Sequence, residues 1–587
     1  MEEYEIEPVR RRPWLRGWRL VLALILTALL GAFVVLWSIR VRLASDYIDR
    51  ELARRGVQAT YDVKRIGFGR QIFENLVIGD PRRPDATARH VEVEILLGWR
   101  GPRVGLITAR GVRMRGRVQG GRVSLGQIDR LLPPPTGLPF RLPDQRVDVA
   151  DAAIVLDTPA GRLALGLAGR GNLSDGFRGR LAGVARELRL GDCTLEEPRA
   201  DVAVRVDSLR PSLAGPATLA SVRCGNDLAV AAPAFALQAT LAPALDEWRG
   251  ATTFRAAALR SGPHRTQDVS GRLTFAGDAG RTAGQVEVHS GAAAVGAFSA
   301  GRTAFGGSYA LSLRRGDLAL NGDVRAEGLT VRDSQVRGIT GALRGTEGTP
   351  LGPIAMALAA AVERAARAGG EAAARLRLVN GRGFGAFRLE QLRFAGRSGV
   401  RVAGVGGQGL TYSWPGGKLR LDGEFALSGG GFPDARFRLR QARPGAPIEG
   451  VGRIAPMAAG GARLALAELR FAASPGGGTR FETAMRLDGP FHGGRVTGLT
   501  LPLRGRFGRG GFVLGEGCVA AGFEALEVEG LRLGRSRLPL CPTGHALGWQ
   551  EPGGRLQAGA ELRGPRFAGR LGQAPVALAA ERMRVDL

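Results

Sequence analysis

The chain is poor in aromatic residues, which make up 6% of its 587 residues, although 44% of its residues are hydrophobic. Glycine is abundant instead, with 90 residues, roughly twice the usual share. The scarcity of large rings argues against a thick globular core and favours many short strands joined by tight turns. Disorder is the other outcome for a glycine-rich chain, and the regular recurrence of Leu, Val, Ile and Phe argues against it.

Lysine is nearly absent, since Lys64 and Lys418 are the only two, and arginine supplies almost all of a net charge of +28. An arginine excess can mark an anionic partner such as nucleic acid or a lipid headgroup, or simply reflect a GC-rich genome. The arginines are spread evenly, and no basic cluster alternates with stacking aromatics. We therefore expect no nucleic-acid partner.

The usual signatures of catalysis and of metal or nucleotide binding are also missing. The sequence has no P-loop, HExxH or GxSxG motif, and its five histidines are dispersed. The stretch GVGGQG at 404–409 satisfies GxGxxG, but a strand and a turn pattern follow it where a nucleotide site needs a helix. The sequence predicts no enzyme activity, no catalytic residue, no metal site and no cofactor.

Cysteine is scarce, with four residues in two distant couples. Cys193 and Cys224 are 31 residues apart, and Cys518 and Cys541 are 23 apart. Pairing within each couple is the simplest of the three possible connectivities and suits an oxidising compartment. Each bridge would then contribute about 3 kcal/mol of stability. Four free, buried thiols are the alternative.

One uncharged run, residues 20–39, is long enough to cross a bilayer as a helix. The membrane-interface residues that we expect beside it are Trp14, Trp18, Trp37, Arg19 and Arg40. Arginine is more frequent before the run than after it, which places the Arg-rich residues 1–19 in the cytoplasm and exports the rest. We expect an uncleaved signal anchor. A cleaved signal peptide is the alternative, but the run is too long and no small-x-small site follows it.

Two patterns follow the membrane run. Residues 43–56 alternate with helical period, apolar on one side and Arg-rich on the other, and predict an amphipathic helix at the membrane surface. From residue 57 to 587 the period changes to two, in strands separated by Gly-rich and Pro-rich turns. Short helices are expected near 125–132 and 353–368, the second with Pro353 in its first turn and Gly369 as its C-cap.

A weak internal repeat runs through the strand region without a fixed period. A glutamate followed within two residues by Leu-x-apolar recurs at these places: ENLVI (74–78), ELRL (187–190), EGLTV (327–331), EQLRF (390–394), ELRF (468–471) and EGLRL (529–533).

Alternation gives each strand one apolar and one charged face. About 40 strands at about 4.8 Å spacing would extend about 200 Å, long enough to matter across a bacterial periplasm. We predict a mostly-β fold in which an elongated, curved antiparallel sheet forms a trough with an apolar groove. Ordinary β-sandwiches, whose apolar faces cover one another, explain the periodicity equally well. The candidate groove-lining residues are Val91, Val93, Ile95, Leu163, Leu165, Leu167, Leu376, Leu378, Leu419, Leu421, Phe437 and Leu439.

Two stretches carry a family resemblance. The first is ASDYIDRELARRGVQATYDVKRIGFGRQIFENLVIGDPRRPDATARHVEVEI (44–95), which follows the membrane run. The second is GRVSLGQIDRLLP (121–133), followed by LPFRLPDQRVDVADAAIVLDTPAGRLALGLAGRGNLSDGFRG (138–179). The chain resembles the YdbH family of AsmA-like proteins of Gram-negative envelopes, relatives of TamB and YhdP, best over its first 180 residues.

The resemblance implies a single-pass inner-membrane protein whose periplasmic β-trough carries phospholipid towards the outer membrane. It also implies a small outer-membrane lipoprotein as a partner at the C-terminal sheet edge, added as a further strand. Known members are usually longer than this chain. Two alternatives remain open: a TamB-like scaffold for outer-membrane proteins, and a purely structural β-sandwich envelope protein.

Overall fold

The computed structural model of the chain describes residues 27, 29, 30 and 49–586, apart from 68, 99–100, 121, 132–140, 313, 475–476, 509–510 and 553–556. These residues form 44 strands and few helices, which confirms the predicted mostly-β fold. The chain divides into two compact units, which are described separately. Unit 1 is Met1–Ala220 with Ala236–Asp246, and unit 2 is Ser221–Phe235 with Glu247–Leu587.

Unit 1 holds the 3₁₀ helix η1 (Gly126–Arg130), where a short helix was expected, and most of β16. Its strands are β1 (Ala59–Ile66), β2 (Arg70–Ile78), β3 (Ala86–Gly98), β4 (Gly101–Arg110), β5 (Arg113–Gln119), β6 (Arg122–Ser124), β7 (Arg146–Thr158), β8 (Gly161–Asn172), β9 (Phe177–Ala185), β10 (Glu187–Leu190), β11 (Cys193–Glu196), β12 (Arg199–Asp207), β13 (Arg210–Thr218) and β16 (Ala234–Leu241).

Unit 2 holds two helices, α2 (Asp333–Arg344) and α3 (Gly352–Ala368), between its strands. Its strands are β14 (Ser221–Cys224), β15 (Leu228–Ala231), β17 (Glu247–Ser261), β18 (His264–Asp278), β19 (Arg281–Ser290), β20 (Ala293–Val295), β21 (Phe298–Ala300), β22 (Arg302–Ser312), β23 (Asp317–Val331), β24 (Gly370–Gly381), β25 (Phe384–Gly396), β26 (Arg401–Trp414), β27 (Lys418–Ser428), β28 (Ala435–Arg440), β29 (Ile448–Ile454), β30 (Met457–Ala459), β31 (Ala462–Leu466), β32 (Leu469–Ala473), β33 (Gly478–Phe491), β34 (Gly494–Gly508), β35 (Gly511–Leu514), β36 (Val519–Phe523), β37 (Ala525–Val528), β38 (Leu531–Leu533), β39 (Ser536–Pro542), β40 (Gly548–Gln550), β41 (Gln557–Arg563), β42 (Arg566–Leu571), β43 (Ala574–Ala579) and β44 (Arg582–Asp586).

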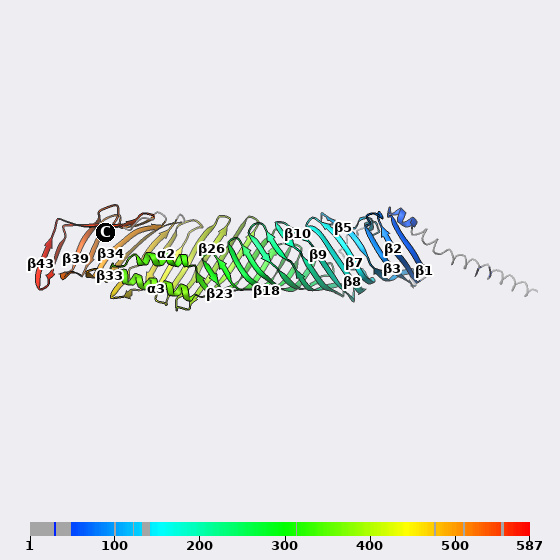
Figure 1. Cartoon of the computed structure of the whole chain (residues 1–587), viewed down its shortest axis with the longest axis horizontal. Helices are drawn as coiled ribbons and strands as arrows, with labels where there is room; N and C mark the ends of the chain where they lie inside the picture. The colour runs from blue at the N-terminus through cyan, green and yellow to red at the C-terminus, as the bar shows by residue number, and fades with distance from the viewer. Residues whose placement is uncertain are drawn as a thin grey trace, which may run out of the picture. The chain divides into compact units, whose positions relative to one another are not determined.

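The sheet of unit 2 is antiparallel throughout its paired core. From β17 to β19, from β22 to β29, and on through β32, β33 and β34, each strand pairs antiparallel with the next. Figure 1 shows these strands slanted and side by side, from green to orange. Because side chains alternate along a strand and pairing keeps register, one face can stay apolar across the whole series.

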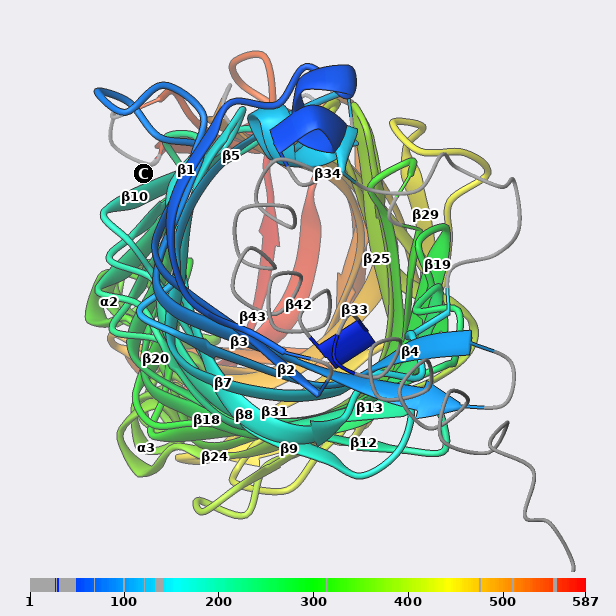
Figure 2. The same cartoon turned by 90° about the vertical axis from the view of Figure 1, so that its right-hand side faces the viewer.

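Strand β7 of unit 1 makes parallel pairings. Its first half pairs parallel with β4 and its second half parallel with β5. Elsewhere β1 to β4 pair antiparallel in sequence, and β7 continues antiparallel through β8, β9, β12 and β13. Figure 2 shows that β1, β2, β3 and β8 bend along their length, as expected for a twisted sheet.

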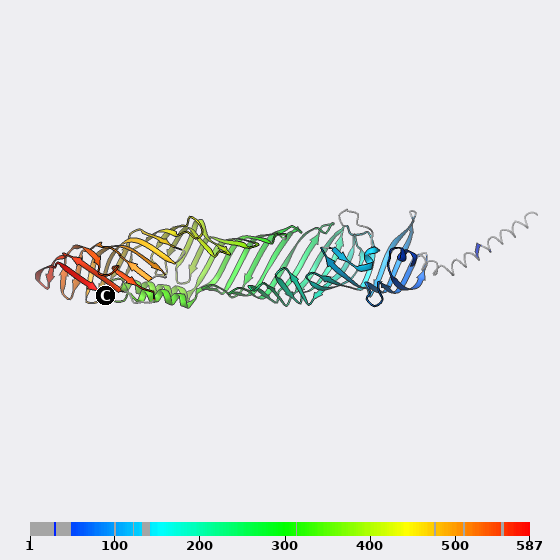
Figure 3. The ribbon, with the colours of Figure 1, turned by 90° about the horizontal axis from the view of Figure 1, so that it is seen from above.

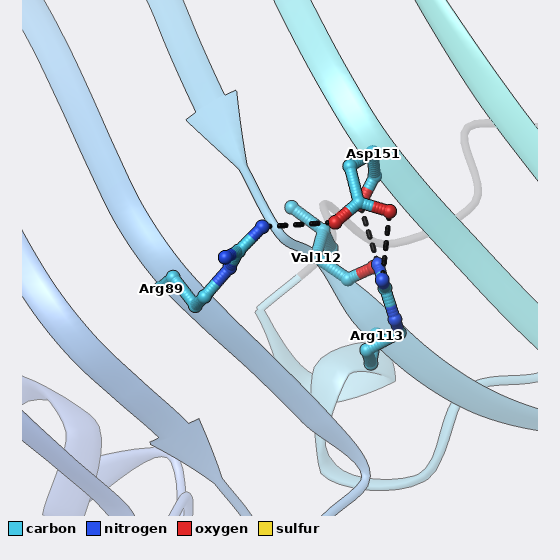
Figure 4. Close-up of polar contacts among 4 residues, drawn as sticks. All are labelled: Arg89, Val112, Arg113 and Asp151. Atoms are coloured by element: carbon cyan, nitrogen blue, oxygen red, sulfur yellow. Dashed lines mark hydrogen bonds and ion pairs between the residues drawn. The ribbon is translucent and has the colours of Figure 1, made fainter.

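Arg89, Arg113 and Asp151 form a charged cluster, here called the clamp, at the point where β7 changes pairing partners (Figure 4). Asp151 lies there at a register shift, with a φ of 55°. Its carboxylate accepts hydrogen bonds from Arg113 at 2.7 Å and from Arg89 at 2.9 Å. Arg113 also donates to the Val112 carbonyl at 2.9 Å. The hydrogen bond from Arg113, followed by the charges of Arg113 and Arg89, lowers the pKa of Asp151.

The recurrent Glu-x-Leu motif marks β-bulges in at least three of its copies. The middle residues Asn75, Gly328 and Gln391 have φ values of 51°, 65° and 54°. Strand pairing shifts register at each of these places. Alternation alone would place the Glu and the Leu, two residues apart, on the same face of the sheet. A bulge inserts one extra residue between them, so the Leu lies on the opposite face from the Glu. The motif has no fixed period along the sequence, because the position of a bulge differs from one strand to the next.

The two helices of unit 2 follow β23 and precede β24 in the sequence, and they pack against each other. The expected helix near 353–368 is α3, with a proline at its start and a positive φ of 62° at its C-cap, Gly369. Helix α2 was not expected from the sequence. Its interior glycines, Gly338 and Gly341, lower helix propensity, so packing on α3 is what stabilises it.

The predicted membrane segment falls almost entirely outside the described residues. Of residues 20–39, only 27, 29 and 30 are described, and they are helical and exposed. The interface residues Trp14, Trp18, Arg19, Trp37 and Arg40 lie outside. Of the predicted helix at 43–56, residues 49–54 are helical and Gly56 has a φ of 66°. No helix within the described part of the chain is long and apolar enough to cross a membrane.

Candidate functional site

Six of the candidate lining residues fall on one face of the unit 2 sheet. Leu376 pairs with Leu389, Leu389 with Leu410, and Leu410 with Leu421, so one apolar row crosses four strands. A second row, two residues along each strand, is formed by Leu378, Phe387, Tyr412 and Leu419. The rings of Phe387 and Tyr412 lie 5.6 Å apart, so they contact each other along this row.

The same face continues through the strands that follow. Phe425 pairs with Phe437, and Leu439 lies two residues along β28 from Phe437. Farther along, Phe471 pairs with Phe481. On the other side, Leu320 of β23 pairs with Leu378, so the register carries this face from β23 to β33.

Glycines lie directly beside several of these rings. A Cβ built on Gly450 would stand 2.1 Å from the ring of Phe471, and one on Gly452 would stand 2.6 Å from the ring of Phe437. The same holds for Gly505 beside Phe481, at 2.8 Å. These rings can lie over the neighbouring strand because the glycine there has no side chain. Abundant glycine and few aromatics thus produce a shallow apolar surface, where a filled core would need more rings.

The opposite face of the unit 2 sheet is charged. Arg438 pairs with Glu424 at 2.8 Å, Arg504 with Glu482 at 2.8 Å and Arg470 with Glu468 at 3.2 Å. These ion pairs are exposed, so each contributes little stability, about 0–1 kcal/mol. Their main effect is to keep this face solvated, which leaves the other face as the one available to apolar ligands.

Unit 1 repeats the separation of faces with the other six candidate residues. On β3, Val91 pairs with Phe73 and Ala109, and Val93 and Ile95 follow at alternate positions of the strand. On β8, the candidates Leu163, Leu165 and Leu167 pair with Leu156, Ile154 and Ala152. Arg162 and Arg180 occupy the alternate positions and pair with Asp157 and Asp201 at 2.9 and 2.5 Å.

A cavity of about 580 Å³ opens where the apolar face of unit 2 meets the two helices. This volume is within the usual range for ligand pockets, about 300–1,000 Å³. The strands contribute Val324, Ala326, Leu329, Ala372, Ala374, Leu389, Leu392, Phe394 and Val402, and the helices contribute Val336, Ile339, Val362, Ala365 and Ala366. None of these residues was among the candidate lining residues predicted from the sequence. The helix positions could not be found from strand alternation, although Val336, Ile339 and Leu343 follow helical spacing.

The helix α3 forms a wall beside the cavity. Ile354 and Ala361 are buried, with 2% and 0% of their surface exposed. The helix contacts β23, β30 and β31, so it follows the ends of several strands, as Figures 1 and 3 show. The turn at Gly460 approaches Pro353 closely. The wall therefore belongs to the packed body of unit 2.

A disulfide joins Cys518, just before β36, to Cys541 in β39. Cys193 and Cys224 are also disulfide-bonded, and no cysteine is free. The structure therefore has no free thiol, which was the alternative to pairing.

The ionisable groups were compared for metal-ligand clusters and for shifted pKa values. No cluster of three metal-ligating side chains occurs within the described residues. The lowered pKa values belong to surface carboxylates, such as Asp157, which accepts a hydrogen bond from Arg162. Burial raises the pKa of Tyr309, whose hydroxyl donates to the Thr274 carbonyl at 3.0 Å. Hydrogen bonding explains the shift of Asp157, and burial explains that of Tyr309.

Comparison with known proteins gives one match. A family model described as "YdbH-like: Intermembrane phospholipid transport protein YdbH" matches residues 27–538, most of the chain. No curated protein and no solved structure matches the chain.

Proposed function

Because this chain belongs to the YdbH-like family of intermembrane phospholipid transport proteins, we propose that it carries phospholipids along the apolar faces of its sheets. The acyl chains would lie on those faces, and the headgroups would stay at the solvated rim. This family is one of lipid transport, and the proposal needs no catalytic step. Transport would run between the inner and outer membranes of the envelope.

The observation that carries the proposal is the apolar face held in register from β23 to β33. Covering apolar surface is favourable by about 0.8 kcal/mol for each fully buried methylene, and the gain is non-directional. An acyl chain can therefore shift from one row of side chains to the next without breaking a specific bond. A surface of this kind suits movement of lipid better than tight binding at one place.

The membrane attachment is also a proposal. Residues 20–39 would anchor the chain in the inner membrane as a single span, with residues 1–19 in the cytoplasm and the strands in the periplasm. Trp14, Trp18 and Trp37 would lie at the interfaces, with Arg19 and Arg40 at the flanks. The Cys518–Cys541 disulfide supports this assignment, because such bonds persist in oxidising compartments.

A partner at the C-terminal edge belongs to the same proposal. Strand β43 pairs with β42, and five of its six residues are exposed. An exposed strand of this kind can accept a further strand from another chain. We propose a small outer-membrane lipoprotein as that chain, and its recovery with the intact protein but not with a Pro-substituted β43 would support the assignment.

Native mass spectrometry with lipid extraction tests the proposal on the full chain purified in detergent. We expect several phospholipids per chain, because the apolar face continues across the strands from β23 to β33. A folded protein that carries no lipid would contradict the proposal and favour a scaffold that binds polypeptide strands at an edge.

A further inference from the structure

The cavity beside α2 and α3 continues into a second hollow of different chemistry. This hollow has a volume of about 430 Å³ and lies between the two helices, which run side by side in Figure 1. It shares Thr330, Val331, Val336 and Ala366 with the apolar cavity. An apolar compartment and a polar one therefore adjoin, with four residues in common.

The polar hollow carries more positive than negative groups. Its lining includes Arg337, Arg344 and Arg367 against Asp333 and Glu363. Glu363 is already engaged, because its carboxylate contacts Arg344 at 2.5 Å and Arg367 at 3.8 Å. The Arg337 side chain is exposed and has no ion-pair or hydrogen-bond partner among the residues that the structure describes.

We propose that the two hollows together bind one phospholipid, with its acyl chains in the apolar cavity and its phosphodiester at Arg337. The single negative charge of a phosphodiester matches the one positive charge by which the hollow's arginines exceed its acids. A guanidinium can also donate two parallel hydrogen bonds to phosphate oxygens. This inference rests on the proposed function and assigns one headgroup position within it.

The site would give the groove a defined place at which a lipid is held by its headgroup. From β24 to β28, the described arginines alternate with the apolar rows and so lie on the opposite face of the sheet. The helix pair supplies both the wall of the cavity and the cations, so a lipid bound there contacts the helices at both its ends.

Photocrosslinking on the full chain tests the site. A photoreactive amino acid replaces Ile339, which lines the apolar cavity and is 54% exposed, or Leu421 on the open face. The probe is a short-chain phosphatidylglycerol, and the phosphate-free diacylglycerol with the same chains is its control. We expect a phospholipid adduct at both positions.

Charge variants then identify the headgroup contact. Arg337→Gln should reduce the phosphatidylglycerol adduct at position 339 roughly fivefold and leave the diacylglycerol adduct unchanged. Arg364→Gln is the matched control, because Arg364 is an exposed arginine of α3 outside the hollow. Equal losses in the two variants would overturn the assignment of Arg337. Competition by inorganic phosphate alone would show an anion site without lipid specificity, which also overturns it.

The two positions separate this inference from the function it rests on. An adduct at Leu421 without one at Ile339 would overturn the helix site and leave transport along the open face intact. Absence of an adduct at both positions, in a chain shown to be folded by circular dichroism, would overturn both.

Discussion

Placing one charge on the apolar face should stop lipid movement without unfolding the protein. Leu419 lies in the second apolar row and is 42% exposed. Val451 is 40% exposed but lies on the charged face, where it pairs with Arg438 and Arg470. The variants Leu419→Asp and Val451→Asp therefore introduce the same carboxylate at equal exposure on opposite faces of one unit.

The magnitude follows from what covers each carboxylate. In the empty protein both remain hydrated, so either substitution should change the free energy of unfolding by less than about 0.5 kcal/mol. An acyl chain that covers Asp at position 419 must remove its water, so the carboxylate takes up a proton, which at pH 7 costs about 4 kcal/mol. Each 1.36 kcal/mol in a barrier is about tenfold in rate, so transfer should slow roughly 1,000-fold.

The assay compares transfer of a fluorescent phospholipid between donor and acceptor vesicles for the full chain and both variants, with lipid per chain counted by mass spectrometry. We expect Leu419→Asp to be slow and Val451→Asp to match the unaltered protein. Equal rates in the two variants would refute the assignment of the apolar face to lipid. Unfolding of Leu419→Asp alone would show that this face is a closed core.

Three further outcomes are expected from the fold. Gly450→Val places a Cβ where the Phe471 ring now lies, 2.1 Å away, so we expect a loss of about 1–3 kcal/mol, read from thermal unfolding. The hydrogen bond from an arginine lowers the pKa of Asp151 below its ordinary 3.8, so its contribution to stability is present above that value and lost as pH falls through the folded pKa. The unfolding midpoints of Asp151→Asn and the unaltered chain should therefore differ near neutral pH and converge in acid, and a constant difference would contradict the clamp. Replacing Cys518 and Cys541 together with alanine removes a bridge across 23 residues and should cost about 3 kcal/mol, measured by urea unfolding, whereas an unchanged midpoint would show that the loop is already ordered.

The strand faces were accessible from the sequence because they depend on a local rule. The pattern ARFRLRQAR at 435–443 separates Phe437 and Leu439 from the arginines around them, and the register of β27, β28 and β29 keeps them apart. The Glu-x-Leu repeat was visible in the sequence as a motif, but the sequence did not show that it marks β-bulges. A bulge is defined by two strands, so the backbone at Gln391 could be interpreted only with its neighbour in place.

The cavity was beyond reach of the sequence because it depends on packing between distant segments. Ile339, Ala366 and Phe394 belong to two helices and a strand, and no period links them. The exchange of partners at β7 is a similar case, since alternation does not distinguish parallel from antiparallel pairing. Helix α2 was missed because its own helix propensity is low, and packing against α3 stabilises it.

What the sequence determined by itself was the period-two separation of apolar and arginine-bearing faces, and with it the mostly-β fold. That separation is local, because it follows from the geometry of one extended strand. Only the tertiary structure decided that the faces join in register from β23 to β33, that glycines lie under phenylalanine rings, and that a helix pair closes one cavity beside a cationic hollow. These features depend on the order in which strands meet, which one strand's alternation does not specify.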